Sequence, residues 1–171
     1  MTQRNYKTFL AAVAAVPLAV LAVTGCGGAT ASPAHPTTKD GRPATIGVAK
    51  EGLGKILVNS QGRTLYLFKK DTGTMSTCTG ACAVNWPPLR AKGKPTVGNG
   101  ASASLVSTTM RPGGTSQVTY NGHPLYRFAN DKKAGDTNGE GLTAFGGSWF
   151  AISGAGNQVS PQTSSPGGYG Y

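Results

Sequence analysis

Residues 62–71 read GRTLYLFKKD, and residues 122–131 read GHPLYRFAND. The two stretches lie sixty residues apart and share the pattern G-x-x-L-Y-x-F-x-x-D, with five identities in ten positions. The match continues upstream at two more positions, Gly54 with Gly114 and Val58 with Val118. Downstream, each copy reaches a tryptophan. An internal repeat of this kind is one structural unit used twice. The sequence therefore predicts two copies of one unit, about 54–89 and about 114–152.

Each copy has the alternation and the turn residues of a β-hairpin. In the first copy, residues 55–59 and 64–68 flank a turn at 60–63. In the second copy, residues 117–120 and 124–128 flank Asn121-Gly122, a dipeptide favoured in type I′ turns. Further strands are expected at 45–49, 104–108 and 148–152, and no stretch of residues 45–156 has a long helical period. The fold class is therefore all-β, a small and mostly antiparallel domain of about seven strands.

The aromatic residues of the repeat should form the core of this domain. Side chains alternate along a strand, so Tyr66 and Phe68 share one face and the neighbouring leucines share the other. The second copy keeps the aromatic pair as Tyr126 and Phe128, whereas Leu67 is replaced by Arg127. The aromatic face is therefore the one expected to be buried, together with Trp86 and Trp149. The alternative is that a tyrosine hydroxyl lines a ligand site.

Two aspartates stand where the repeated strand should end. Asp71 and Asp131 can each accept hydrogen bonds from main-chain amides two or three residues further on, which would fix the loop. The alternative is a pair of carboxylates acting together as acid and base or as metal ligands. Nothing in the sequence shows that the two approach each other.

The N-terminal residues have the order of a lipoprotein signal peptide. Arg4 and Lys7 precede an uncharged apolar run at 9–23, which is shorter than the roughly 20 residues that a spanning helix needs. The run ends in Val-Thr-Gly-Cys, the pattern of a lipobox, so residues 1–25 should be removed and Cys26 should receive the lipid. Two acyl chains give stable attachment to a membrane. We expect an exported protein at the outer face of the cell membrane, with this lipid as its one attached group.

Lipidation of Cys26 also explains why the number of cysteines is odd. The chain has three, and with Cys26 lipidated only Cys78 and Cys82 remain to pair. Outside the cytosol such a pair is normally oxidised. A structural disulfide is the first interpretation, and a redox-active pair is the alternative because short-loop disulfides can be strained. Haem attachment would need C-x-x-C-H, and no second cysteine pair completes a zinc site.

Composition separates the domain from its flanks and limits its partners. Residues 26–44 and 157–171 are rich in small residues and proline or glycine, so a flexible tether and a disordered tail are expected around a domain at 45–156. Removal of residues 1–25 leaves 14 basic and 6 acidic residues. Such a charge suits anionic headgroups or wall polymers rather than nucleic acid, or else serves only solubility.

The loop around residue 138 is a weak metal candidate. Asp136, Asn138 and Glu140 place oxygens at alternate positions, as a calcium loop begins, but Gly147 stands where the bidentate glutamate belongs. No G-x-S-x-G pattern and no Ser, His and Asp set stands out. We therefore expect no catalytic residues and no metal.

Three segments resemble a known family. They are the repeated Y-x-F-x-x-D pattern, the segment CTGACAVNWPPL at 78–89, and the stretch from Gly135 to Trp149. Together they look like the secreted-repeat lipoproteins with a Yx(FWY)xxD motif. The resemblance implies an exported and often lipid-anchored protein whose family has no known function, so it supplies no catalytic residues.

The expected function is a non-enzymatic binding or interaction module of the envelope. Its partners would be the membrane, through the anchor, and an envelope polymer or protein. The alternatives are a redox or electron-transfer accessory that uses Cys78 and Cys82, and a metal-binding envelope protein.

Overall fold

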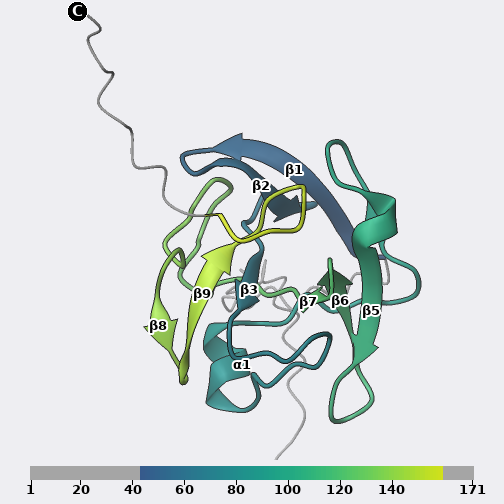
Figure 1. The fold of residues 1–171 in the computed structure, drawn as a ribbon, viewed down its shortest axis with the longest axis vertical. Helices are drawn as coiled ribbons and strands as arrows, with labels where there is room; N and C mark the ends of the chain where they lie inside the picture. Colours follow the sequence, from purple (N-terminus) through teal and green to yellow (C-terminus); the bar gives the residue numbers. More distant parts are fainter. Residues whose placement is uncertain (1–42, 160–171) are drawn as a thin grey trace, which may run out of the picture. The chain divides into compact units, whose positions relative to one another are not determined.

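Short strands joined by loops make up residues 43–159, the part of the chain that the computed structural model describes (Figure 1). The expected signal peptide, Cys26 and the tether up to residue 42 lie outside this part. The strands are β1 (Thr45–Glu51), β2 (Gly54–Asn59), β3 (Tyr66–Phe68), β4 (Thr96–Val97), β5 (Val106–Met110), β6 (Ser116–Tyr120), β7 (His123–Pro124), β8 (Thr143–Ala144) and β9 (Gly147–Ala151). One short helix, α1 (Ala81–Asn85), and one 3₁₀ turn, η1 (Ala103–Leu105), accompany them. The predicted all-β class is confirmed.

The strands form three small sheets, with the orders β2-β1-β4, β3-β9-β8 and β5-β6-β7. All pairings are antiparallel except that of β1 with β4. Figure 1 shows β1 and β2 at the top, β8 and β9 on the left, and β5 and β6 on the right, with β3 between them. The chain therefore wraps its sheets around one central strand.

The repeated unit is larger than the predicted hairpin. In the first copy β1 pairs with β2, and a bridge between Val58 and Thr64 continues the sheet. In the second copy β5 pairs with β6, and β6 pairs with β7. Each unit thus begins one strand earlier than residues 54 and 114, because the preceding strand supplies the main-chain partners of β2 and of β6.

The structure also corrects the alignment of the two copies upstream of the turn. Thr64 bridges Val58, whereas its counterpart Pro124 pairs with Thr119. Leu57, rather than Val58, therefore corresponds to Val118, and both are fully buried in the same cluster. The shift arises because the second turn is the tight Asn121-Gly122 type and the first is one residue longer.

The two copies exchange their tryptophan segments. β3 of the first copy pairs with β9 of the second, where Phe68 faces Trp149. Tyr126 of the second copy bridges Pro88 of the first, and Ala129 donates its N–H to the carbonyl of Asn85 at 2.8 Å. The two predicted hairpin units are therefore present, and the structure adds that each one completes the sheet of the other.

Both faces of β3 are buried, and each contributes to a different core. Tyr66 and Phe68 enter an aromatic core, as the alternation predicted. Leu65 and Leu67 are at most 2% exposed and enter a second, leucine-rich core. The prediction of a single buried face therefore failed for the leucine side, because β3 lies at the centre of the domain and has packing on both sides.

The fold continues slightly beyond the predicted end of the domain. Gln158 bridges Ile152, and Val159 donates its N–H to the carbonyl of Ala151 at 2.8 Å. Residues 157–159 thus belong to the domain rather than to a tail. Among the residues that the structure describes, no helix has the length and apolar character needed to cross a bilayer.

Candidate functional site

The tyrosine of each copy hydrogen-bonds to the aspartate of the other. The Tyr66 hydroxyl donates to Asp131 Oδ2 at 2.7 Å, and the Tyr126 hydroxyl donates to Asp71 Oδ2 at 2.7 Å. The same two tyrosines are joined through their main chains by hydrogen bonds of 2.9 and 3.0 Å. The Y-x-F-x-x-D pattern is thus a contact between the copies, which sequence comparison alone did not reveal.

Each aspartate also holds the loop that follows it. Asp71 Oδ1 accepts from the N–H and the hydroxyl of Thr77 at 2.7 and 2.9 Å. Asp131 Oδ1 accepts from the N–H and the side-chain amide of Asn138 at 3.0 and 3.2 Å. The donors lie six and seven residues on, rather than the two or three predicted, because each loop bends back to its aspartate. The two carboxylates have no hydrogen-bond donor in common.

Six aromatic rings form one cluster across the two copies, which we call the aromatic cluster: Tyr66, Phe68, Trp86, Tyr126, Phe128 and Trp149. The indole rings stack on each other at 3.9 Å between centroids and 4° between planes. Phe68 stacks on Trp149 and Phe128 on Trp86, which gives a column of four rings. Tyr66 and Tyr126 meet the indoles edge-on. Such geometry adds stability beyond the apolar area that it buries.

Burial and hydrogen bonding keep the two tyrosines of this cluster protonated. Desolvation raises the pKa of Tyr66 and of Tyr126 far above the usual value for tyrosine, and the accepting aspartates add to the effect. Burial also raises the pKa of Asp131, against the lowering effect of its donors Tyr66 and Asn138. The tyrosines are therefore neutral donors at physiological pH.

A glycine closes the aromatic cluster on one side. A Cβ atom on Gly139 would lie 2.8 Å from the Trp86 ring and 2.9 Å from the Tyr66 ring. Its N–H donates to the Tyr66 hydroxyl at 3.3 Å. The loop thus packs its main chain directly on the rings, which leaves no room there for a bound molecule.

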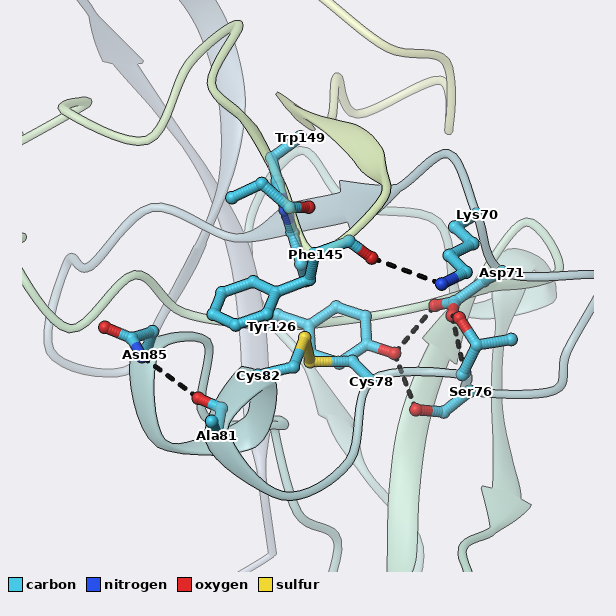
Figure 2. Close-up of a disulfide and its surroundings, with 12 residues drawn as sticks. Lys70, Asp71, Ser76, Cys78, Ala81, Cys82, Asn85, Tyr126, Phe145 and Trp149 are labelled. Carbon is cyan, nitrogen blue, oxygen red and sulfur yellow. Dashed lines mark hydrogen bonds between the residues drawn. A yellow bond between two sulfur atoms is a disulfide. The ribbon is translucent and has the colours of Figure 1, made fainter.

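The predicted disulfide between Cys78 and Cys82 is confirmed, with Cα atoms 5.3 Å apart. Both residues are buried, at 1% and 6% exposed. Figure 2 shows the bridge beside the ring of Tyr126, where the short helix α1 begins. The helix leads directly into Trp86, so the disulfide fixes the approach of the first tryptophan to the aromatic cluster.

A buried arginine ties this loop to the second copy. Arg111 is 8% exposed and donates to Ser76 Oγ, to Gln117 Oε1 and to the carbonyl of Cys78. Ser76 donates in turn to the Tyr126 hydroxyl oxygen at 2.7 Å, because the single proton of that hydroxyl goes to Asp71. No sequence signal pointed to Arg111, because an arginine before Pro-Gly-Gly has the pattern of an exposed turn.

The calcium-loop candidates face different partners. Asp136 Oδ2 accepts from the amides of Lys132 and Lys133 at 2.8 and 3.0 Å, which lowers the pKa of Asp136. Glu140 Oε2 accepts from the Ala151 amide at 2.6 Å, and burial raises the Glu140 pKa. Asn138 donates its N–H and its side-chain amide to Asp131 Oδ1. No group of three or more His, Cys, Asp or Glu residues is placed to hold a metal within residues 43–159.

A groove of about 570 Å³ lies at the end of the β1–β2 hairpin. It is lined by Val48, Ala49, Lys50, Lys55, Asn99, Gly100, Ser153, Gly154 and Ala155, and we call it the basic groove. Lys50 and Lys55 stand directly opposite each other on β1 and β2. No sequence signal pointed to this groove, because its walls come from two loops far apart in the chain.

The repeat itself is matched by a known family model. A family described as a secreted repeat of unknown function matches residues 47–90 and residues 107–153, more than half of the chain. The chain belongs to this family. No curated protein and no solved structure matches the chain.

The two secreted repeats of the family coincide with the units of the structure. Each match begins within the first strand of a unit, β1 or β5, and ends just after its tryptophan segment. Arg90 and Ser153, the last residue of each match, bridge Gln117 and Ile56 of the other repeat. Each family unit therefore contains two segments that pair with the other repeat. One is the strand that carries the Y-x-F motif, and the other is the segment that carries the tryptophan.

Proposed function

We propose that this secreted-repeat protein is a non-enzymatic binding module of the bacterial envelope, held at the outer face of the membrane by a lipid on Cys26. The observation that supports it most is the closure of the aromatic cluster. The tyrosine hydroxyls of the repeats are fully used as donors to the aspartate carboxylates. The tryptophans stack on each other and are at most 1% exposed. The repeat therefore serves as a scaffold, and recognition takes place on its surface.

The charge of that surface favours an anionic partner. Residues 43–159 contain 12 Lys and Arg against 5 Asp and Glu. Four of the five carboxylates accept hydrogen bonds from tyrosine hydroxyls or main-chain amides: Asp71, Asp131, Asp136 and Glu140. Positive charge thus dominates the freely solvated groups. Wall polymers and anionic headgroups are the anionic components that an exported, anchored protein meets.

Metabolic labelling with a clickable fatty acid tests the anchor. We expect the label on the full chain and its loss in Cys26→Ser, with the variant released into the medium. The double variant Cys78→Ala/Cys82→Ala is the matched control and should keep the label. An exported full chain that carries no label would contradict anchoring.

Cosedimentation tests the binding role. The full chain with Cys26→Ser, which carries no lipid, is mixed with intact cell walls, with walls stripped of their anionic polymers, and with vesicles of phosphatidylglycerol or phosphatidylcholine. We expect pelleting with at least one anionic component and with neither stripped walls nor phosphatidylcholine. A protein that stays in solution with every component would overturn the proposal.

A thiol–disulfide titration separates this function from the redox alternative. A structural bridge should have a potential below about −300 mV, whereas exchange catalysts lie at about −120 to −270 mV. The burial of Cys78 and Cys82 supports the first value. A potential in the second range would favour the redox accessory. Elemental analysis of the purified protein tests the metal-binding alternative, which a stoichiometric metal would favour.

A further inference from the structure

The basic groove places two lysines side by side without a carboxylate on their face of the sheet. Lys50 and Lys55 are cross-strand partners and both are exposed. Like charges directly opposite each other in an antiparallel pair destabilise the sheet. Glu51 does not relieve them, because it follows Lys50 in β1 and faces the other way, where its carboxylate lies beside Gly135. The fold therefore keeps an unfavourable pair of charges at this position.

Main-chain atoms form much of the wall opposite the lysines. Gly100 has a φ of +76°, and a Cβ there would lie 2.9 Å from the Cβ of Val48. A Cβ on Gly154 would lie 2.9 Å from the carbonyl oxygen of Gly100. The two loops can approach β1 so closely only because these positions lack side chains. Asn99 and Ser153 then add polar side chains at the same wall.

The groove also has an apolar part and a suitable size. Val48, which shares a face of β1 with Lys50, contributes aliphatic surface between the lysines and the loops. Its volume of about 570 Å³ falls in the usual range of small-molecule sites, roughly 300 to 1,000 Å³. No aromatic side chain lines it, so it lacks the stacking surface with which proteins hold the bases of single-stranded nucleic acid.

We propose that the basic groove binds a phosphodiester of a polyol-phosphate chain, such as a poly(glycerol phosphate). Lys50 and Lys55 bracket the phosphate, Asn99 and Ser153 hydrogen-bond to the polyol hydroxyls, and Val48 contacts its carbons. Ammonium groups act as point charges toward phosphate, so they suit a ligand whose charge repeats along a flexible chain. This inference rests on the proposed function and names the ligand class of that surface.

The test measures binding of purified poly(glycerol phosphate) by the full chain carrying Cys26→Ser. We expect Lys50→Gln/Lys55→Gln to weaken binding about tenfold and to lower the slope of log affinity against log salt by about two, because each lysine that contacts a phosphate releases about one counterion. The matched control is Lys132→Gln/Lys133→Gln, which removes the same charge elsewhere and should weaken binding less than about threefold. Amide shifts in an NMR titration should concentrate at residues 48–50, 99–100 and 153–155.

Folding of the variants is checked by thermal melting. Lys50→Gln/Lys55→Gln should melt no lower than the parent, because it removes a pair of opposed like charges. If both double variants weaken binding equally, the attraction is a property of net charge and the groove proposal is overturned. Binding to phosphatidylglycerol vesicles but not to the polymer, lost in Lys50→Gln/Lys55→Gln, would overturn the polymer as the source of the phosphodiester.

Two further outcomes separate this inference from the proposed function. Pelleting with intact walls that is unchanged in Lys50→Gln/Lys55→Gln would overturn the groove and leave the envelope-binding role standing. No binding to any wall, polymer or anionic vesicle would overturn both.

Discussion

Tyr66 and Tyr126, which occupy the same position in the two repeats, each donate a main-chain N–H to the carbonyl oxygen of the other, at 2.9 and 3.0 Å. This reciprocal pair lies at the centre of a near-twofold arrangement. Around it, each tyrosine hydroxyl reaches the aspartate of the other repeat, and the two tryptophans stack on each other. The repeated pattern is therefore self-complementary, and we expect one copy to need the other in order to fold.

Removing the two tyrosine hydroxyls should have unequal effects. Asp131 is 2% exposed, so Tyr66→Phe leaves a buried carboxylate short of one donor, and we expect a loss of about 2 kcal/mol. Asp71 is only half-buried and water can replace the lost donor, so Tyr126→Phe should cost about 1 kcal/mol or less. Urea unfolding of both variants measures the difference. Equal losses would mean that burial of the accepting carboxylate does not set the cost.

Splitting the chain should show that the repeats depend on each other. Because β3 pairs with β9 and Tyr126 bridges Pro88, a first half ending at Gly100 and a second half starting at Ala101 each lack the partner strands of their aromatic residues. We expect each half alone to give the circular dichroism and NMR spectra of an unfolded chain, and an equimolar mixture to regain the folded spectrum. A half that folds by itself would contradict the exchange.

The elements of this fold could be predicted from the sequence, but their pairing could not. Alternation and turn residues located most strands, and Asn121-Gly122 marked a real turn, with φ values of 48° and 79°. The two cysteines that remain after lipidation of Cys26 were correctly predicted to form a disulfide. Periodicity shows which side chains share a face, yet it does not show which strand lies alongside. The hairpin within each repeat was therefore predicted, whereas the pairing of β3 with β9 of the other repeat was not.

The candidate site illustrates the same limit. Asp71 and Asp131 were recognised as loop-fixing residues, but their tyrosine partners lie in the other repeat, which local spacing does not report. No local pattern predicts the burial of Arg111, because two of its partners, Ser76 and Cys78, lie more than thirty residues away in the chain. Loops distant in the chain build the basic groove, so no local pattern marks it.

Alkaline pH should unfold the protein through the same tyrosines. Burial raises the pKa of Tyr66 and of Tyr126 above the usual value near 10, whereas both tyrosines titrate normally once the chain unfolds. Their contribution to stability is thus complete below about pH 10 and is lost as the pH rises further. Tyrosinate absorbance at 295 nm should rise together with the loss of circular dichroism. Tyr66→Phe/Tyr126→Phe should show a weaker loss of stability above pH 10, and an unchanged slope would contradict the assignment.

Arg111 should be among the more sensitive polar residues of the domain. Arg111→Met leaves Gln117 Oε1 and the Cys78 carbonyl without their donor, so we expect a loss of about 2 to 3 kcal/mol in chemical unfolding. Arg111→Lys keeps the charge but lacks the planar group that reaches several acceptors, and its loss should be intermediate. The exposed Arg90 is the control, with Arg90→Met expected to change stability by less than about 0.5 kcal/mol.

The turn between β8 and β9 places a phenylalanine in a conformation that this residue type rarely adopts. Phe145 has a φ of +57° and Gly146 one of +85°, close to the values at Asn121-Gly122. The left-handed region costs an ordinary side chain about 1 to 2 kcal/mol, whereas asparagine tolerates it. Phe145 is 41% exposed, and Figure 2 shows it near Trp149 with its carbonyl accepting from Lys70.

Comparison of two substitutions isolates this backbone cost from the packing of the ring. Phe145→Asn and Phe145→Ala both remove the ring, so they lose the same contacts and differ in their tolerance of positive φ. We expect Phe145→Asn to be more stable than Phe145→Ala by about 1 kcal/mol in thermal or urea unfolding. Asn121→Ala in the other turn should cost at least as much against its own parent, because Asn121 has a φ of 48° and its side-chain amide also donates to the Gly156 carbonyl at 3.1 Å. If the two Phe145 variants were equally stable, the backbone of this turn would not be strained.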